Sequence, residues 1–303
     1  MIQPRTISGQ LISNGSALEM TPERLGWLVP TDAELPLTHI KDIYHQQGYV
    51  WLKGFFERRE ILAFRRDFFA IFEGTGLLAQ GSDPVEGLYR GEGEQRALIK
   101  KIFWEIVRSP AYEAFCTMPR LWTFYEALLQ DEPYLHKRKI IRYTLPGERN
   151  CTGGHYDLIY LRAGTDRLYS SWIPIGDIPV EMGGLIYLEG SDALGRKMEA
   201  QFSARNADQP PQERISAYNQ NMRAGGWISV DLADMARRFN SRWLMADYAA
   251  GDMVIHSPYM IHAATVNTDP HGRIRLSTDI RYQAKSDEID KRWMLDWASD
   301  DHL

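Results

Sequence analysis

Cysteine and long hydrophobic runs are both scarce in this sequence of 303 residues. It has two cysteines, Cys116 and Cys151, and no CxxC pair, which excludes a disulfide framework and indicates free thiols in a reducing compartment. No window of about 18 residues is apolar and uncharged, so we expect no transmembrane helix. Residues 1–16 lack the apolar stretch of a secretory signal. These absences together predict a soluble cytoplasmic protein.

An excess of positive charge is also missing. The chain has 35 Lys and Arg against 40 Asp and Glu, which gives a net charge of −5. Because nucleic-acid binders carry a basic footprint, we expect a small-molecule substrate and no nucleic-acid or membrane partner. The hydrophobic share of 44% and the charged share of 25% are typical of a globular protein and exclude whole-chain disorder, collagen and coiled coil. A monomer and a homodimer both remain open.

The spacing of apolar residues changes character along the chain. The first half has helical spacing, which predicts helices at 36–47, 57–72, 95–108, 111–115 and 118–130, a helix start at Thr21–Arg24 and one strand at 48–54. The second half has short strand-like runs between turn signals, at 139–144, 157–161, 168–175, 184–188, 244–247, 252–256 and 274–282. A helical insert is expected over 192–238.

Helices followed by short strands indicate an α+β fold whose main body is an antiparallel β sandwich or barrel. No linker divides the chain, so we expect a single domain over 1–303, with an irregular arm at 1–20 and a core at 36–285. Residues 74–94 are rich in glycine and form a long loop, which is either a mobile surface excursion or a lid over a site.

The chemistry-bearing residues begin with His155 and Asp157. On a strand these two side chains point to the same face, because side-chain direction has a period of two residues. Two histidines and one carboxylate bound on one face suit Fe(II) and leave coordination positions open. The second histidine comes from the segment 251–262, where His256 and His262 are the two candidates.

A second pair of polar residues follows shortly after these histidines. Arg275 and Ser277 share one face of a predicted strand, where a guanidinium and a hydroxyl can together hold a carboxylate. Arg273 has the same strand parity and is the competing guanidinium. The sequence thus predicts a metal site with a carboxylate clamp beside it, which is what a metal-chelating 2-oxo acid requires.

In this order the segments resemble the phytanoyl-CoA dioxygenase family of Fe(II)/2-oxoglutarate oxygenases. The family's H-x-D matches His155-x-Asp157, and its closing R-x-S matches Arg275-x-Ser277. Its G-D segment, which runs on to a histidine and an asparagine, matches Gly251-Asp252 through His262 to Asn267. A tryptophan downstream of H-x-D matches Trp172.

The resemblance implies a double-stranded β-helix core, a cupin-like jelly roll, with flanking N-terminal helices and a helical insert. It implies Fe(II) held by His155, Asp157 and His262. It also implies 2-oxoglutarate salt-bridged to Arg275, with Ser277 and Trp172 nearby. The implied activity is a dioxygenase that uses O2 to hydroxylate or desaturate a small organic substrate, a natural-product or lipid-like intermediate, with succinate and CO2 as co-products.

The intact Asp157 favours oxygenation over halogenation, because related halogenases have Ala or Gly at this position. Two other interpretations stay open. One is a non-catalytic jelly-roll binding protein, and the other is a cupin-type enzyme with another metal such as Zn²⁺ or Mn²⁺. The basic run 136–139 is either a solvated edge or a contact for an anionic substrate group, and Arg142 is a candidate for the barrel mouth.

Overall fold

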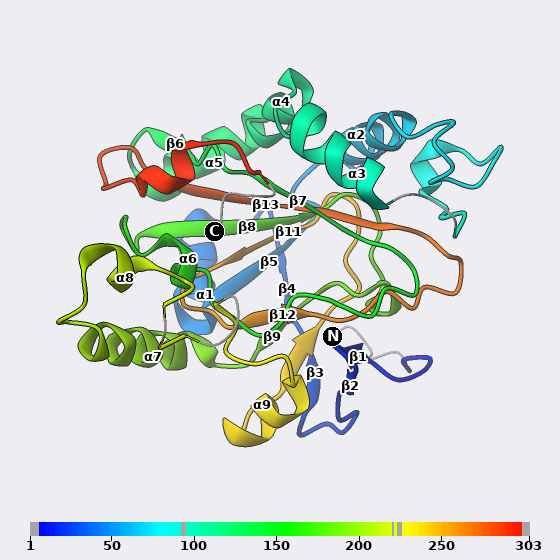
Figure 1. The fold of residues 1–303 in the computed structure, drawn as a ribbon. Helices are drawn as coiled ribbons and strands as arrows, with labels where there is room; N and C mark the ends of the chain where they lie inside the picture. Colours follow the sequence, from blue (N-terminus) through cyan, green and yellow to red (C-terminus); the bar gives the residue numbers. More distant parts are fainter. Residues whose placement is uncertain (1–5, 92–94, 220, 223–225, 299–303) are drawn as a thin grey trace.

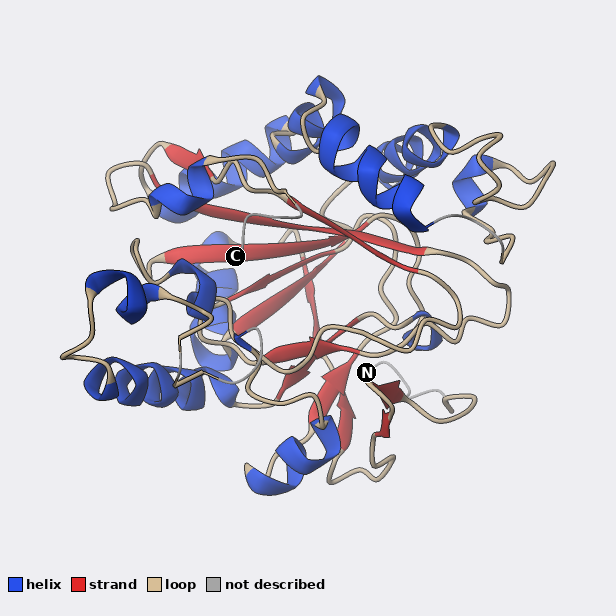
Figure 2. Ribbon diagram, in the orientation of Figure 1, coloured by secondary structure: helices blue, strands red, loops and turns tan. Residues whose placement is uncertain are grey.

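The computed structural model describes residues 6–91, 95–219, 221–222 and 226–298. Two β-sheets face each other across the interior, and helices cover the outer face of the larger sheet (Figures 1 and 2). Residues from both sheets line one narrow cavity, so the space between the sheets is where the polar side chains of the second half of the chain meet.

The larger sheet has seven strands. Its order is β4 (Pro30–Asp32), β5 (Tyr49–Lys53), β11 (Met253–His256), β8 (Leu168–Pro174), β13 (Arg275–Ala284) and β6 (Pro133–Leu135), and β7 (Ile140–Thr144) also pairs with β13. The long strand β13 therefore pairs with β8 along one edge, while β7 and β6 share its other edge. The strand β13 thus joins β8 on one side to β7 and β6 on the other.

The smaller sheet has four strands in the order β12 (His262–Ala264), β9 (Leu185–Leu188), β10 (Trp243–Met245) and β3 (Leu25–Trp27). A separate hairpin of β1 (Ile12–Ser13) and β2 (Ser16–Ala17) lies in the segment predicted to be an irregular arm. The short strand β12 brings His262 to the inner side of this sheet, where it faces β9.

Helices pack in two groups around the sheets. The first group is α1 (Leu37–Gln47), α2 (Arg58–Ala70), α3 (Gln95–Lys101), a π-helix at Ile102–Ile106, α4 (Pro110–Cys116) and α5 (Pro119–Leu129). The second group is α6 (Leu158–Leu161), α7 (Ser191–Arg205), α8 (Pro211–Ile215) and α9 (Leu232–Arg238). Short 3-10 turns lie at Pro84–Glu86, Val180–Met182 and Lys291–Met294. Among the described residues, no helix has the length and apolar character needed to cross a membrane.

The first helical group fixes which face of β13 points inward. Leu276, Ile280 and Tyr282 pack into the same apolar cluster as the buried side chains of α2, α4 and α5. Because side chains alternate along a strand, the intervening residues from Arg275 to Arg281 face the space between the sheets. All of the latter are buried, and three of them, Arg275, Asp279 and Arg281, carry charge.

Most elements predicted from the sequence are present, but some predictions were wrong. Residues 157–161 are not a strand: Asp157 has helical backbone angles and begins α6. Thr21–Arg24 forms a turn that leads into β3 instead of starting a helix. The three-residue strands β3, β4, β6 and β12 were missed, because segments this short carry too little periodicity to detect.

The glycine-rich loop is tied to the core over its described part, residues 74–91. The buried guanidinium of Arg65 donates to the carbonyls of Val85 (2.6 Å) and Glu86 (3.1 Å). Leu88 forms an antiparallel β-bridge with Arg273, two residues before β13 begins. None of these described loop residues lines the two cavities at the site below, and 92–94 lie outside the described residues.

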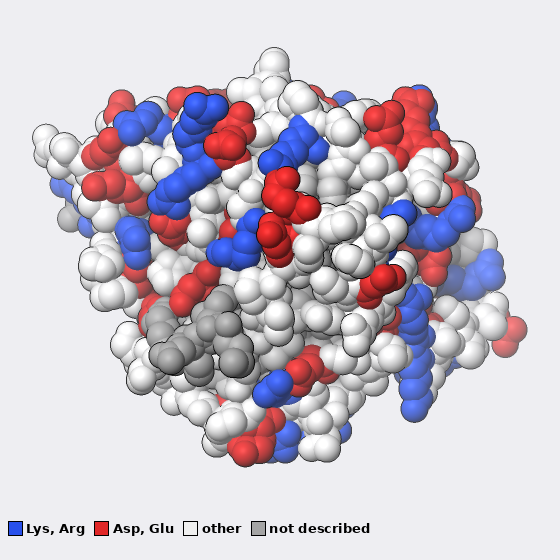
Figure 3. All heavy atoms as spheres, turned by 180° about the vertical axis from the view of Figure 1, so that it is seen from behind, with Lys and Arg blue, Asp and Glu red and all other residues white. Residues whose placement is uncertain are grey.

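Acidic and basic side chains are interspersed on the face drawn in Figure 3. Several of the exposed charges form ion pairs, for example Arg58 with Asp177 and Arg242 with Glu189. Such exposed pairs contribute little stability, because water screens them. The mixed pattern agrees with the mildly acidic composition of the chain.

Candidate metal centre

His155, Asp157 and His262 come together between the two sheets. One ligand atom from each residue lies within 4.8 Å of the others. Asp157 Oδ1 is 3.8 Å from His155 Nε2 and 3.7 Å from His262 Nε2. A backbone bridge holds the two histidines side by side, since each of them donates its N–H to the other's carbonyl. All three side chains are buried, so the group has the composition and spacing to hold a metal ion.

Both histidines are fixed in the tautomer that a metal ligand requires. His155 Nδ1–H donates to the Gly153 carbonyl at 2.9 Å, and His262 Nδ1–H donates to the Met260 carbonyl at 2.9 Å. A carbonyl only accepts, so Nδ1 carries the proton in each ring. The two Nε2 lone pairs are therefore free and face Asp157 Oδ1. Such backbone bonds orient ligating imidazoles in known metal sites.

The other oxygen of Asp157 is fully engaged. Its Oδ2 accepts from Arg281 Nη2 at 2.9 Å, from His256 Nε2 at 3.3 Å and from the Ser170 hydroxyl. These three donors stand in one cross-strand row on β11, β8 and β13, where Ser170 pairs with both His256 and Arg281. The row fixes the carboxylate so that Oδ1 alone remains for the two histidines.

His256 has a different environment from His262. Its Nδ1 accepts from the Tyr187 hydroxyl at 3.0 Å, so its proton lies on Nε2 and points to Asp157 Oδ2. Of the two candidates in the sequence, the structure thus brings His262 into the three-residue group and leaves His256 as a hydrogen-bond donor behind it.

The protonation states of the three centre residues favour the binding of a cation. Burial raises the pKa of Asp157, but the charge of Arg281 and the hydrogen bond from His256 outweigh it and hold that pKa well below its usual range. Burial lowers the pKa of His155, and burial followed by repulsion from His155 lowers the pKa of His262 further. The centre therefore presents one anionic oxygen and two neutral imidazole nitrogens.

A narrow inner cavity leads from this centre to Arg275. Trp172, Leu185, Ala264 and Arg275 line it together with residues of the centre, and its free volume is about 20 Å³. That is roughly the space of one water molecule, so a larger ligand has to extend outward or move these side chains apart. Arg275 Nη1 donates to the Gly183 carbonyl at 2.7 Å, and burial lowers the pKa of Arg275 to about 10.

Two buried polar atoms beside this cavity have no hydrogen-bond partner among the described residues. They are Arg275 Nε and Ser277 Oγ, on the inward face of β13. Unsatisfied buried groups are rare in folded proteins because each costs free energy, and they mark places where a polar ligand belongs. The competing residue Arg273 instead forms a two-pronged pair with Asp269, at 2.7 and 2.9 Å, and does not line this cavity.

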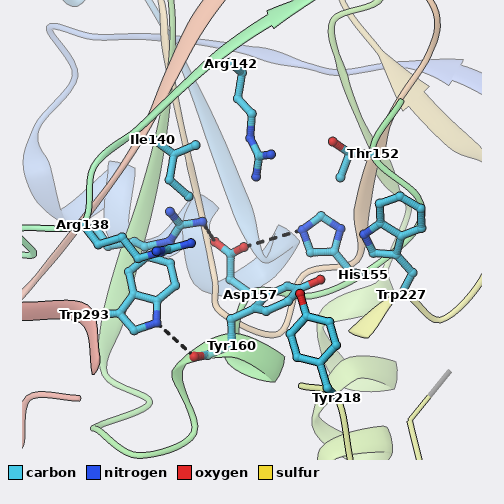
Figure 4. Close-up of a pocket in the computed structure, with 11 residues that line it drawn as sticks. Arg138, Ile140, Arg142, Thr152, His155, Asp157, Tyr160, Tyr218, Trp227 and Trp293 are labelled. Carbon is cyan, nitrogen blue, oxygen red and sulfur yellow. Dashed lines mark hydrogen bonds and ion pairs between the residues drawn. The ribbon is translucent and has the colours of Figure 1, made fainter. Parts of the chain in front are cut away.

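A wider outer cavity opens on the other side of the centre (Figure 4). Its volume is about 420 Å³, within the range of small-molecule sites. The lining residues are Arg138, Ile140, Arg142, Thr152, His155, Asp157, Tyr160, Tyr218, Trp227, Arg281 and Trp293. Five of these residues also line the inner cavity, so the two spaces meet at the candidate metal centre; they are Arg142, Thr152, His155, Asp157 and Arg281.

The sequence predicted six site residues. The structure places His155, Asp157, His262, Arg275 and Trp172 around the inner cavity, whereas Ser277 lies two residues from Arg275 on β13 and is not part of the cavity lining. Sequence reasoning missed the supporting donors Ser170 and Arg281. The parity of β13 could have indicated Arg281, because that residue has the same strand face as Arg275. The reason given for the His155–Asp157 pairing was wrong, since the two side chains converge where the chain turns into α6 and not along a strand.

Comparison with known proteins decides the family. The chain matches the family described as phytanoyl-CoA dioxygenase (PhyH) over residues 44–275. It belongs to the phytanoyl-CoA dioxygenase family. Among curated proteins, none matches this family member by sequence.

Solved structures share the fold of this PhyH-family chain at low sequence identity. The epimerase SnoN, in complex with Fe3+, alpha ketoglutarate and nogalamycin RO, has a TM-score of 0.53 at 16% identity, covering 84% of this chain and 85% of SnoN. The alpha ketoglutarate dependent carbocyclase SnoK has a TM-score of 0.53 at 20% identity, covering 86% and 89%. EctD from S. alaskensis, in its apoform, has a TM-score of 0.54 at 14% identity, covering 95% and 92%.

Proposed function

We propose that this PhyH-family protein is an Fe(II)- and 2-oxoglutarate-dependent dioxygenase that oxidises a small organic substrate. The observation that carries the proposal is the convergence of two imidazole nitrogens and one carboxylate oxygen on a point between two connected cavities. Fe(II) takes this set of three ligands and keeps other positions open for co-substrate and O2. The two facing sheets are, in this proposal, the two halves of a double-stranded β-helix.

In this assignment His155, Asp157 and His262 hold the iron. When bound, the iron would supply the activation of O2 at the expense of 2-oxoglutarate, which becomes succinate and CO2. The chain itself contributes a carboxylate that stays ionised and two imidazoles that stay neutral. Arg281 and His256 keep Asp157 anionic and oriented without competing for Oδ1.

Arg275 and Ser277 hold the far carboxylate of 2-oxoglutarate, with Trp172 as part of the wall. A guanidinium and a hydroxyl on one strand face suit a carboxylate, and the unpartnered Arg275 Nε and Ser277 Oγ supply the donors. Trp172 is fully buried and packs at a tilt against Tyr248, with ring centroids 4.6 Å apart, so it acts as packing that excludes water from this end.

The outer cavity receives the substrate, and a C–H bond that faces the metal centre is hydroxylated or desaturated. The fold neighbours include an epimerase and a carbocyclase, so the fold alone does not fix the outcome of the oxidation. A natural-product or lipid-like intermediate matches the size and the partly aromatic lining of the cavity.

The alternatives are less well supported by the same side chains. A non-catalytic binding protein would retain a buried Asp157 and two orphaned donors at a cost in stability. A cupin-type site with another metal commonly uses more histidines. Among the described residues, the further histidine close to this centre is His256, and its Nε2–H donates a hydrogen bond to Asp157.

The first test measures the binding of Fe(II) and 2-oxoglutarate, because the substrate is unidentified. Protein freed of metal is titrated anaerobically with Fe(II) and 2-oxoglutarate, and the complex is followed by its visible absorption and by the thermal unfolding midpoint. We expect both signals in the parent and in His39→Ala, whose exposed histidine lies far from the centre in sequence, and neither signal in His155→Ala. Succinate formation that requires Fe(II), 2-oxoglutarate and O2 completes the test.

Two results would contradict the proposal. A parent protein that binds 2-oxoglutarate equally well without metal would support a plain binding function. Preferential retention of Zn²⁺ or Mn²⁺ with no 2-oxoglutarate binding would support the cupin-type alternative.

A further inference from the structure

We infer that Asp279 and Arg142 form a charge-compensating pair that sets the affinity of the inner cavity for 2-oxoglutarate. Asp279 opposes the anionic co-substrate, and Arg142 cancels that opposition. This inference rests on the proposed function and adds two residues that control co-substrate binding at the same site. It follows from the lining of the inner cavity, from the cross-strand geometry of β7 and β13 and from the charges that act on Arg275.

A second carboxylate lines the cavity assigned to 2-oxoglutarate. Asp157 and Asp279 are the two carboxylates among the described residues that line the inner cavity. The Asp279 side chain is 10% exposed, so water and salt screen its charge poorly. A carboxylate in this position repels the dianion 2-oxoglutarate unless a cation compensates its charge. Co-substrate binding therefore needs a cation beside Asp279.

Asp279 lies on the same strand face as the residues assigned to the co-substrate. The inward-facing positions of β13 are, in order, Arg275, Ser277, Asp279 and Arg281, and all four are buried. Two residues along a strand span about 7 Å, so the Asp279 carboxylate follows directly after the Ser277 hydroxyl. The negative charge thus stands at the end of the proposed carboxylate clamp.

Arg142 is placed to compensate Asp279 from the neighbouring strand. In the register of β7 and β13, Arg142 pairs with Ser277. Asp279 pairs with Ile140, two residues before Arg142, so Arg142 and Asp279 are diagonal neighbours on one face. Arg142 Nε donates to Asp279 Oδ2 at 3.0 Å. Figure 4 shows the Arg142 side chain extending toward the candidate metal centre.

Both charges act on Arg275. Burial lowers the pKa of Arg275 to about 10, the negative charge of Asp279 opposes this decrease, and the positive charge of Arg142 adds to it. The far carboxylate of 2-oxoglutarate, assigned to Arg275, meets the same two charges with the opposite signs. Asp279 therefore disfavours the bound anion, and Arg142 favours it.

Arg142 can favour the anion in two ways. It lines both cavities, so its guanidinium could bind a carboxylate of the co-substrate directly, or it could act by cancelling the charge of Asp279. Its hydrogen bond to Asp279 supports the second way. The two ways differ in what happens when both charges are removed together, because only compensation makes the loss of Arg142 harmless in the absence of Asp279.

The test is a double-mutant cycle, measured by calorimetric titration of anaerobic, Fe(II)-loaded protein with 2-oxoglutarate. Arg142→Gln should weaken binding about tenfold, because it leaves Asp279 uncompensated. Asp279→Asn should strengthen binding by about the same factor, because the charge of Arg142 is then unopposed. The double variant Arg142→Gln/Asp279→Asn should return to within about threefold of the parent.

Further variants separate charge from a loss of structure. Arg142→Lys keeps the charge and should stay within about threefold of the parent. Arg58→Gln is the matched control and should bind like the parent, because Arg58 is also paired with an aspartate, Asp177, at 2.8 Å and lines neither cavity. A gain of affinity does not arise from a damaged fold, so Asp279→Asn provides the measurement if Arg142→Gln fails to fold.

The two proposals fail in different ways. Normal 2-oxoglutarate binding in the parent with unchanged or weaker binding in Asp279→Asn would overturn the compensating pair alone. A double variant as weak as Arg142→Gln would also overturn it, since that result would mean that Arg142 binds the anion directly. Loss of Fe(II)-dependent 2-oxoglutarate binding in the parent would instead overturn the proposed function.

Discussion

Arg281 and Asp157, which are 124 residues apart in the chain, form a buried ion pair of 2.9 Å on the side of the carboxylate turned away from the two histidines. The pair holds Asp157 Oδ2, and Oδ1 stays available beside the two histidines. Buried pairs are sensitive to loss of one partner, because the remaining charge is left uncompensated.

Replacing Arg281 should therefore weaken metal binding without removing a ligand. We expect Arg281→Gln to lower Fe(II) affinity by roughly 10- to 100-fold, the usual cost of losing an outer partner of a metal ligand. Competition with a chelator of known affinity measures the change. Lys285→Gln, just beyond the end of the same strand, is the control, and an equal loss there would contradict this role of Arg281.

The two histidines near the end of the chain should behave differently. His262→Ala removes a donor of the three-residue group and is expected to abolish Fe(II) binding, whereas His256→Ala removes one hydrogen bond to Asp157 and should weaken binding about tenfold. The same chelator competition separates the two variants. Equal and complete loss in both would mean that His256 is itself a ligand.

Arg275, which begins β13, and Arg273, two residues before it, give a similarly matched pair. Arg275→Gln should reduce 2-oxoglutarate affinity by about 100-fold, and Ser277→Ala by a smaller factor, since a charged donor contributes more than a hydroxyl. Arg273→Gln should leave that affinity unchanged, because Arg273 is paired with Asp269 outside the cavity. Calorimetric titration of the Fe(II)-loaded protein with 2-oxoglutarate is the measurement. A larger effect at Arg273 than at Arg275 would reverse the assignment.

His136 should make folding stability depend on pH. Burial lowers the pKa of His136 to about 4, although the hydrogen bond with Gln283 partly opposes this. The unfolded chain binds the proton near its ordinary pKa of about 6.5, so stability is full above that pH and falls toward pH 4, by about 3 kcal/mol.

Urea denaturation of metal-free protein between pH 7 and pH 4 tests this expectation. His136→Gln should flatten the pH dependence by about the contribution of one buried histidine. The other buried histidines are present in both proteins, so the difference between the two curves isolates His136. Parallel curves would show that His136 titrates normally in the folded state.

Prediction from sequence went furthest where residues act through short, ordered segments. His155, Asp157, His262 and Arg275 lie in such segments, and the family resemblance placed them together before any geometry was known. The hydrogen bonds that Ser170 and His256 donate to Asp157 could not be predicted, because they depend on the register between β11 and β8.

Backbone conformation set a second limit. Gly153-Gly154 precedes His155, and alternation alone suggested an extended strand through Asp157, but the chain turns into α6 at that residue. The strand β12, which carries His262, has three residues and pairs with β9 from a distant part of the chain. Long-range pairing of this kind leaves little trace in local periodicity.

The strand β13 ties together parts of the molecule that are usually considered separately. Shifting its register against β8 by a single residue would turn Arg275 and Arg281 toward the helices and bring Leu276 and Ile280 into the space between the two sheets. An insertion or deletion within this strand would thus abolish chemistry and hydrophobic packing in the same event.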